Sequence, residues 1–212
     1  MTGPKKYRLK ELIAQCDPDA PIPDELREWD EVPAVGMEQA MPLRTFIDVE
    51  ASGLDMRESY PIEVAWVDSM GNSDSILIQP APTWLFWDHE AEAVHGISRD
   101  TLFRRGHPLR QVAERINNAL GMETVYSDAP NFDGRWIDFL FQAAELERDF
   151  NIVDLRILYS EIGAIATDRF HERISREAPT HRAEADARRY ALAYRYAIAP
   201  ADGFTRNYAF HE

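Results

Sequence analysis

Between residues 43 and 80 the apolar and polar positions alternate with a period close to two, which predicts β-strands. The stretches are LRTFIDVE, PIEVAWVD and SDSILIQP, and turn-rich pieces such as SMGNSD separate them. Because the connections are short, we expect three strands in meander order.

The chain from residue 109 onward changes to alternating helical and extended patterns. Apolar residues at helical spacing predict helices over 109–120 and 132–148 and a last helix over 181–198, while TVYSD and FNIVD predict short strands. Hairpins followed by alternating helix and strand are typical of an α/β fold in which helices flank a mixed sheet. We therefore predict this class of fold.

Residues 1–40 have no regular period of their own. Nine acids stand against five bases between residues 5 and 40, and Pro18, Pro21, Pro23 and Pro33 interrupt the segment. Such a composition favours an extended acidic segment that does not build a core. We expect three parts: an extended N-terminal arm at 1–40, a folded domain at 41–198 and a C-terminal tail at 199–212.

The composition fits a single domain in a reducing compartment. The chain has 212 residues, of which 45% are hydrophobic, enough for one sizeable core. Its single cysteine, Cys16, excludes an internal disulfide, and there is no CxxC motif for zinc. No apolar run approaches the roughly 20 residues of a membrane span, and the N-terminus lacks the apolar core of a secretory signal. We expect a soluble, cytoplasmic protein without a membrane partner.

The formal net charge of -14 bears on which nucleic acids the chain could bind. A protein that coats long duplexes needs a broad basic face to neutralise phosphates, and this charge argues against one. A site with two divalent cations, in contrast, needs several carboxylates. The charge therefore favours short or single-stranded substrates.

The first candidate motif is FIDVE. A strand's period of two places Phe46, Asp48 and Glu50 on one face and Ile47 and Val49 on the other. Since both faces begin apolar, the strand is expected to be central. Two carboxylates at the end of a buried strand repel each other unless a cation lies between them. The alternative is a solvated strand end that carries ordinary surface charge.

The second motif is the last helix, THRAEADARRYALAYRYA. Asp186 lies within a stripe of small and aromatic residues, so it should face the core and needs a metal or a positive partner. His181 stands five residues earlier, about 140° away on an ideal helix. The two can share a site only if His181 lies in the loop or a frayed first turn, which Pro179 favours.

The third motif is SDAPNFDGRW, where a short strand ends before a helix. Asp133 could cap that helix or face a site. Asp128 is a competing candidate, and before Ala-Pro it could equally be a turn residue.

Taken together, these motifs resemble the DEDDh branch of the DnaQ-like exonucleases, whose fold is ribonuclease H-like. The phrases DVEASGL, HGIS, SDAPNFDGRW and HRAEADA carry the resemblance over about residues 43–198. Alanine replaces the usual threonine of the first motif. Ser127 and Asp128 stand where family members often have histidine and asparagine, and the NFDGRW phrase favours Asp133 as the family's aspartate.

This resemblance implies a 3′→5′ exonuclease that releases nucleoside monophosphates. Two divalent cations, Mg²⁺ or Mn²⁺, would be bound by Asp48, Glu50, Asp133 and Asp186, and His181 would act as the general base. His95 of the HGIS phrase and Leu54, which follows the first motif, are weaker candidates for substrate contact.

The arm has a resemblance of its own. Residues 7–36 resemble the C-terminal tail of MazE-type antitoxins, which implies a MazF-like toxin as a possible partner of residues 1–40. An unrelated leader, or a misplaced start codon, would also explain this segment. The alternative to an enzyme is therefore a toxin-neutralising or scaffold protein that acts through the arm.

Overall fold

The computed structural model describes residues 42–199, which form a five-stranded sheet in the order β3-β2-β1-β4-β5. β1 pairs antiparallel with β2 and parallel with β4. β2 and β3 are also antiparallel, and β4 and β5 are parallel. The predicted meander and the central place of the first strand are both confirmed. The strands are β1 (Thr45–Ala51), β2 (Pro61–Asp68), β3 (Ser73–Leu77), β4 (Thr124–Ser127) and β5 (Asn151–Asp154).

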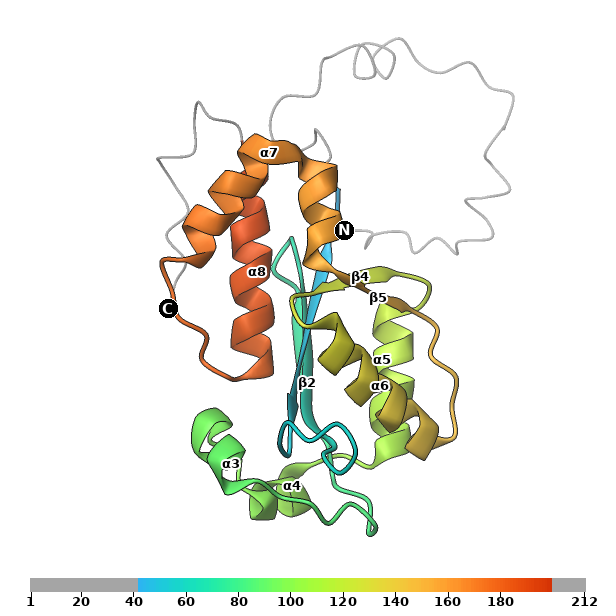
Figure 1. The fold of residues 1–212 in the computed structure, drawn as a ribbon. Coiled ribbons are helices and arrows are strands. Elements are labelled where there is room, and N and C mark those ends of the chain that lie inside the picture. The colour runs from blue at the N-terminus through green and yellow to red at the C-terminus, as the bar shows by residue number, and fades with distance from the viewer. Residues whose placement is uncertain (1–41, 200–212) are drawn as a thin grey trace, which may run out of the picture. The chain divides into compact units, whose positions relative to one another are not determined.

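Helices cover both faces of this sheet, as predicted. Figure 1 shows α7 and α8 on one face and α5 and α6 on the other, while the short α3 and α4 lie beyond one end of the sheet. The helices are α3 (His89–His95), α4 (Arg99–Arg105), α5 (Leu109–Leu120), α6 (Pro130–Ala144), α7 (Leu155–Ile174) and α8 (Ala183–Ile198).

The alternation along β1 divides the core into two layers. Ile47 and Val49 belong to the cluster beneath α5 and α6, whereas Phe46 belongs to the cluster beneath α7 and α8. Burial of both layers fixes the strand's register, because a slip of one residue would exchange its faces. Asp48 and Glu50 are thereby held on the α8 side of the sheet, near the end of β1.

Three helices were not predicted from the sequence, and two have other bounds than expected. α3 and α4 have only seven residues each, too few to show a period clearly. α7 changes direction at Gly163, whose backbone (φ 80°, ψ 168°) is not helical, so no single apolar stripe runs along it. α6 spans Pro130–Ala144 instead of 132–148, and α8 begins at Ala183 instead of residue 181.

The arm at residues 1–40 and the tail beyond residue 199 lie outside the described residues. Within residues 42–199, none of the helices combines the length and the apolar character that a membrane span requires.

Candidate metal centre and active site

A cleft of about 570 Å³ lies where the end of β1, the start of α6 and the start of α8 meet. Each of the three sequence motifs contributes to its lining, although the motifs are far apart in the chain. All five residues of the predicted site line it: Asp48, Glu50, Asp133, His181 and Asp186.

Asp48 and Glu50 project from β1 into this cleft without a partner of opposite charge. Among residues 42–199, no side-chain hydrogen bond or salt bridge holds either carboxylate. Burial, and then the charge of Asp133, raise the pKa of Asp48 well above its usual range. Burial, and then the charge of Glu63, raise the pKa of Glu50 to about 7.

Asp133 lies in the first turn of α6, with only 4% of its surface exposed. It is not the helix N-cap, because that position belongs to Ala129. The Ser127 hydroxyl donates to Asp133 Oδ2 at 2.5 Å. Burial nevertheless raises the pKa of Asp133 to about 8, with Asp128 contributing in the same direction. The carboxylate therefore faces the cleft as a poorly compensated charge.

Asp186 shapes the loop that precedes α8. Its Oδ1 accepts the backbone N–H of Thr180 at 3.0 Å, and its Oδ2 accepts that of His181 at 2.8 Å. His181 has a φ of +56°, in the left-handed region, so this residue is not part of the right-handed helix α8. His181 thus lies in the loop, the arrangement that sequence reasoning required for it to join Asp186.

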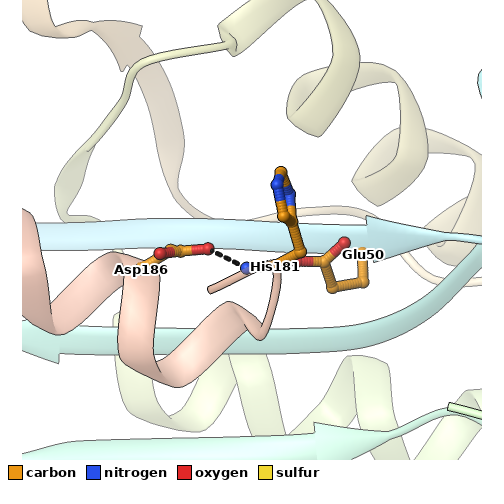
Figure 2. A group of neighbouring side chains, drawn as sticks. All are labelled: Glu50, His181 and Asp186. Carbon is orange, nitrogen blue, oxygen red and sulfur yellow. Dashed lines mark hydrogen bonds between the residues drawn. The ribbon is translucent and has the colours of Figure 1, made fainter. Parts of the chain in front are cut away.

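These placements bring Glu50, His181 and Asp186 together from the strand, the loop and the helix (Figure 2). Each offers one ligand atom, and the three atoms lie within 4.8 Å of one another. A second group with the same spacing consists of Asp48, Asp128 and Asp133. Asp128 was the alternative to Asp133, and the structure brings both to the cleft.

Glu63 on β2 is a residue of this region that sequence reasoning missed. It pairs with Glu50 across the two strands and is 2% exposed. Its carboxylate accepts from Arg182 Nη2 at 2.6 Å and from the backbone N–H of Ala183 at 3.1 Å, which caps the start of α8. The signal was an acid between the apolar residues of the strand PIEVAWVD, but its partner Arg182 lies 119 residues away.

The weaker candidates His95 and Leu54 also line the cleft. His95 is the last residue of α3 and is 5% exposed, and its Nδ1 accepts the backbone N–H of Ile97 at 3.0 Å. Leu54 is 76% exposed at the cleft. Its side chain is therefore free to contact a ligand.

The donor set fits divalent cations of the hard type. Carboxylate oxygens are the ligands that Mg²⁺ and Mn²⁺ prefer, and a buried group of acids without opposing charge is stabilised when cations enter it. The charge of Arg182 lowers the pKa of Glu50 and so opposes the effect of burial, but the guanidinium of Arg182 is already paired with Glu63. The residues at the cleft therefore suit a centre with two metal ions.

We predict that the metal-free protein loses stability as the pH rises from about 5 to about 8. Raised pKa values mean that the folded chain binds more protons than the unfolded chain, so the stabilisation is present at low pH and is lost as these carboxyls ionise. A shift of Glu50 to about 7 corresponds to about 3 kcal/mol. Urea unfolding in the presence of a chelator, at pH 5 and pH 8, measures the difference.

Glu50→Gln is the matched variant for this measurement, since its free energy of unfolding should depend less on pH. In the unaltered chain, added Mg²⁺ should restore stability at pH 8. A free energy of unfolding that stays constant or increases over this range would show that these carboxyls are not destabilised in the fold.

Comparison with solved structures identifies the fold. The zinc-bound complex of Escherichia coli exonuclease I with single-stranded DNA matches with a TM-score of 0.57 and 15% identity, over 74% of this chain and 40% of that one. The E. coli enzyme with a dA16 oligonucleotide matches with a TM-score of 0.54 and 15% identity, over 72% of this chain and 40% of that one. Exonuclease I from Methylocaldum szegediense matches with a TM-score of 0.54 and 16% identity, over 75% of this chain and 41% of that one. The chain has the ribonuclease H-like fold predicted from its sequence, and it spans about two fifths of those chains.

Sequence comparisons add one short match. No family model matches the chain. Antitoxin PemI of Escherichia coli is 56% identical over 34 residues, which is 16% of this chain and 40% of the antitoxin. The match lies in the N-terminal part, where the sequence resembles an antitoxin tail.

Proposed function

We propose that this chain is a metal-dependent 3′→5′ exonuclease that removes nucleoside monophosphates from short or single-stranded nucleic acid. The observation that carries the proposal is the convergence of Asp48, Glu50, Asp133 and Asp186 in one cleft, two of them without a side-chain partner among residues 42–199. Its fold, shared with exonuclease I, supports the same reaction class.

In this proposal the four carboxylates hold two cations, Mg²⁺ or Mn²⁺. When bound, such ions supply Lewis acidity to the scissile phosphate and make water more acidic. His181 is exposed on the cleft and accepts the proton of the attacking water, as imidazole does near neutral pH. The water oxygen would bond to phosphorus as the bond from phosphorus to the 3′ oxygen breaks. The 3′ oxygen stays on the shortened strand and takes up a proton from solvent, and a nucleoside 5′-monophosphate leaves without a covalent intermediate.

The net charge and the comparisons support the substrate class that we propose. Exonuclease I was solved with single-stranded DNA and with a dA16 oligonucleotide. The net charge of -14 here weakens the attraction of a long polyanion. We therefore assign short or single-stranded substrates, with DNA and RNA both to be tried.

Digestion of labelled nucleic acids tests the activity directly. Single-stranded DNA, single-stranded RNA and duplexes, labelled at the 5′ end, are incubated with Mg²⁺, with Mn²⁺ or with a chelator. We expect a ladder that shortens one nucleotide at a time from the 3′ end and vanishes with the chelator. Internal cuts, or no product from any substrate with either metal, would refute the assignment.

The roles of the two middle aspartates can be separated by metal dependence. We predict that Asp133→Asn lowers the rate at least about 100-fold at every metal concentration, because a buried ligand is lost at the centre. Asp128→Asn, at an exposed residue, should regain most of the rate when the metal is in excess. Rates over a Mn²⁺ series check this, and the reverse pattern would make Asp128 the essential ligand.

A second role is favoured by the match to PemI. We propose that residues 1–40 are a separate arm that binds a MazF-like toxin, followed by the exonuclease domain at 41–198 and a tail at 199–212. The excess of acids in the arm suits the basic groove of an RNA-cleaving toxin. An extended acidic segment would order on its partner at a cost in binding free energy.

Deletion of residues 1–40 tests the arm. We expect nuclease activity to remain and affinity for a MazF-like toxin, measured by calorimetry, to disappear. A truncated protein that loses nuclease activity, or one that binds the toxin as well as the full chain does, would contradict this division of roles.

A further inference from the structure

Asp128 lines the cleft at a position where members of the resembled family often have asparagine, and its place there is unusual for a turn residue. It directly follows β4 and is exposed. Nevertheless, one of its carboxylate oxygens lies within 4.8 Å of ligand atoms of both Asp48 and Asp133. An exposed side chain that could turn toward water thus points at two other carboxylates.

A specific contact holds it there. The hydroxyl of Tyr190 donates to Asp128 Oδ2 at 2.5 Å. Tyr190 is 7% exposed, and its ring is fixed between Phe170, stacked with centroids 6.5 Å apart, and the guanidinium of Arg189 at 5.2 Å. Because Tyr190 is on α8, one turn beyond Asp186, the helix that bears one predicted ligand also orients Asp128.

The arrangement gives the two halves of the cleft different ligand sets. One half has two carboxylates, Glu50 and Asp186, beside the proposed base His181, and the other has three carboxylates: Asp48, Asp128 and Asp133. The affinity of an oxygen site for a divalent cation rises with the number of charged ligands and with their rigidity. Asp133, held by Ser127, and Asp128, held by Tyr190, are both restrained in this way.

Resting on the proposed function, we propose that Asp128 is a further metal ligand, which with Asp48 and Asp133 forms a three-carboxylate site for the second divalent cation. Tyr190 is its positioning residue. Such a site needs no phosphate oxygen from the substrate to reach a useful affinity. Both cations therefore bind before nucleic acid does.

A different role for Asp128 would have the opposite consequences. If its charge served to repel the phosphates of longer substrates, its removal would lower KM for nucleic acid and leave the binding of cations unchanged. The ligand role instead predicts weaker cation binding in the absence of any substrate. Titration with the metal alone distinguishes the two.

The experiment is a Mn²⁺ titration of the full-length chain without nucleic acid, followed by the paramagnetic resonance signal of free Mn²⁺. We expect two bound ions in the unaltered protein. Asp128→Asn should weaken one of them about 100-fold and leave the other unchanged, and Tyr190→Phe should weaken the same ion about tenfold. Asp149→Asn, an exposed acid outside the cleft, is the control for the change in charge and should bind both ions normally.

Circular dichroism confirms that each variant is folded before titration. Two ions bound with unchanged affinity by Asp128→Asn would overturn the ligand role while leaving the exonuclease proposal in place. If the unaltered protein bound only one Mn²⁺ ion, the proposal that both cations bind before nucleic acid would be wrong. No Mn²⁺ bound at all would remove the metal centre, and with it the proposed function.

Discussion

Replacement of Asp48 or Asp186 by asparagine is expected to stop the release of nucleotides, with rates at least about 10⁴-fold below that of the unaltered chain. Asp48 belongs to one ligand group and Asp186 to the other, so each substitution removes a charge from a different half of the cleft. Because the proposed reaction uses a cation in each half of the cleft, we expect the two losses to be of similar size. Initial rates on a labelled single-stranded oligonucleotide, with Mg²⁺ in excess, provide the measurement.

Stability of the metal-free variants shows whether the loss concerns chemistry or folding. Asp48→Asn should stabilise the chain at pH 8, because it removes a buried charge whose pKa is raised by burial and by Asp133. Asp186→Asn should instead destabilise it, because the single amide oxygen cannot replace both carboxylate oxygens that accept the N–H groups of Thr180 and His181. Asp149→Asn should keep full activity. A folded Asp48 or Asp186 variant that retains a tenth of the rate would refute the metal assignment.

The parts of the fold that the sequence predicted are those set by neighbours along the chain. Strand alternation placed Phe46 and Ile47 in opposite core layers, and the burial of each in its own cluster confirms this. The stripe of α8 likewise predicted that Asp186 faces inward, and it is 6% exposed. A period of two or 3.6 over one element is enough for such inferences.

The parts that the sequence could not predict depend on contacts between distant residues or on irregular backbone. α7 was not predicted because the non-helical Gly163 interrupts the helical spacing of its apolar residues. Glu63 had no visible role until Arg182 and Ala183, far along the chain, were placed against it. Asp128 seemed an alternative to Asp133, since spacing alone does not show that β4 and α6 bring both carboxylates to one cleft.

His181 illustrates both sides of this limit. Helical spacing placed it about 140° from Asp186, so only a loop conformation could bring it to the site. The structure supplies that conformation through a left-handed backbone at φ +56° and a hydrogen bond from its amide to Asp186. The sequence identified Asp186 as an inward-facing acid, but it could not predict that its carboxylate would accept the amide of His181.

The loop conformation also makes His181→Asn a clean test of the general base. Asparagine tolerates a positive φ better than most residues, so the backbone and its hydrogen bond to Asp186 should persist. The substitution removes the imidazole that we propose as the general base, and we expect the rate to fall about 10² to 10⁴-fold. His107→Asn, an exposed histidine outside the cleft, is the matched control and should leave the rate unchanged.

Two measurements on the same variant decide between a base and a ligand. His181 offers a ring nitrogen within 4.8 Å of ligand atoms of Glu50 and Asp186, so coordination is the competing role. A general base can be removed without loss of the cations, and Mn²⁺ affinity should then stay within about twofold while single-turnover hydrolysis slows. If Mn²⁺ affinity and rate fall together, His181 binds metal and the proton must leave the water by another route.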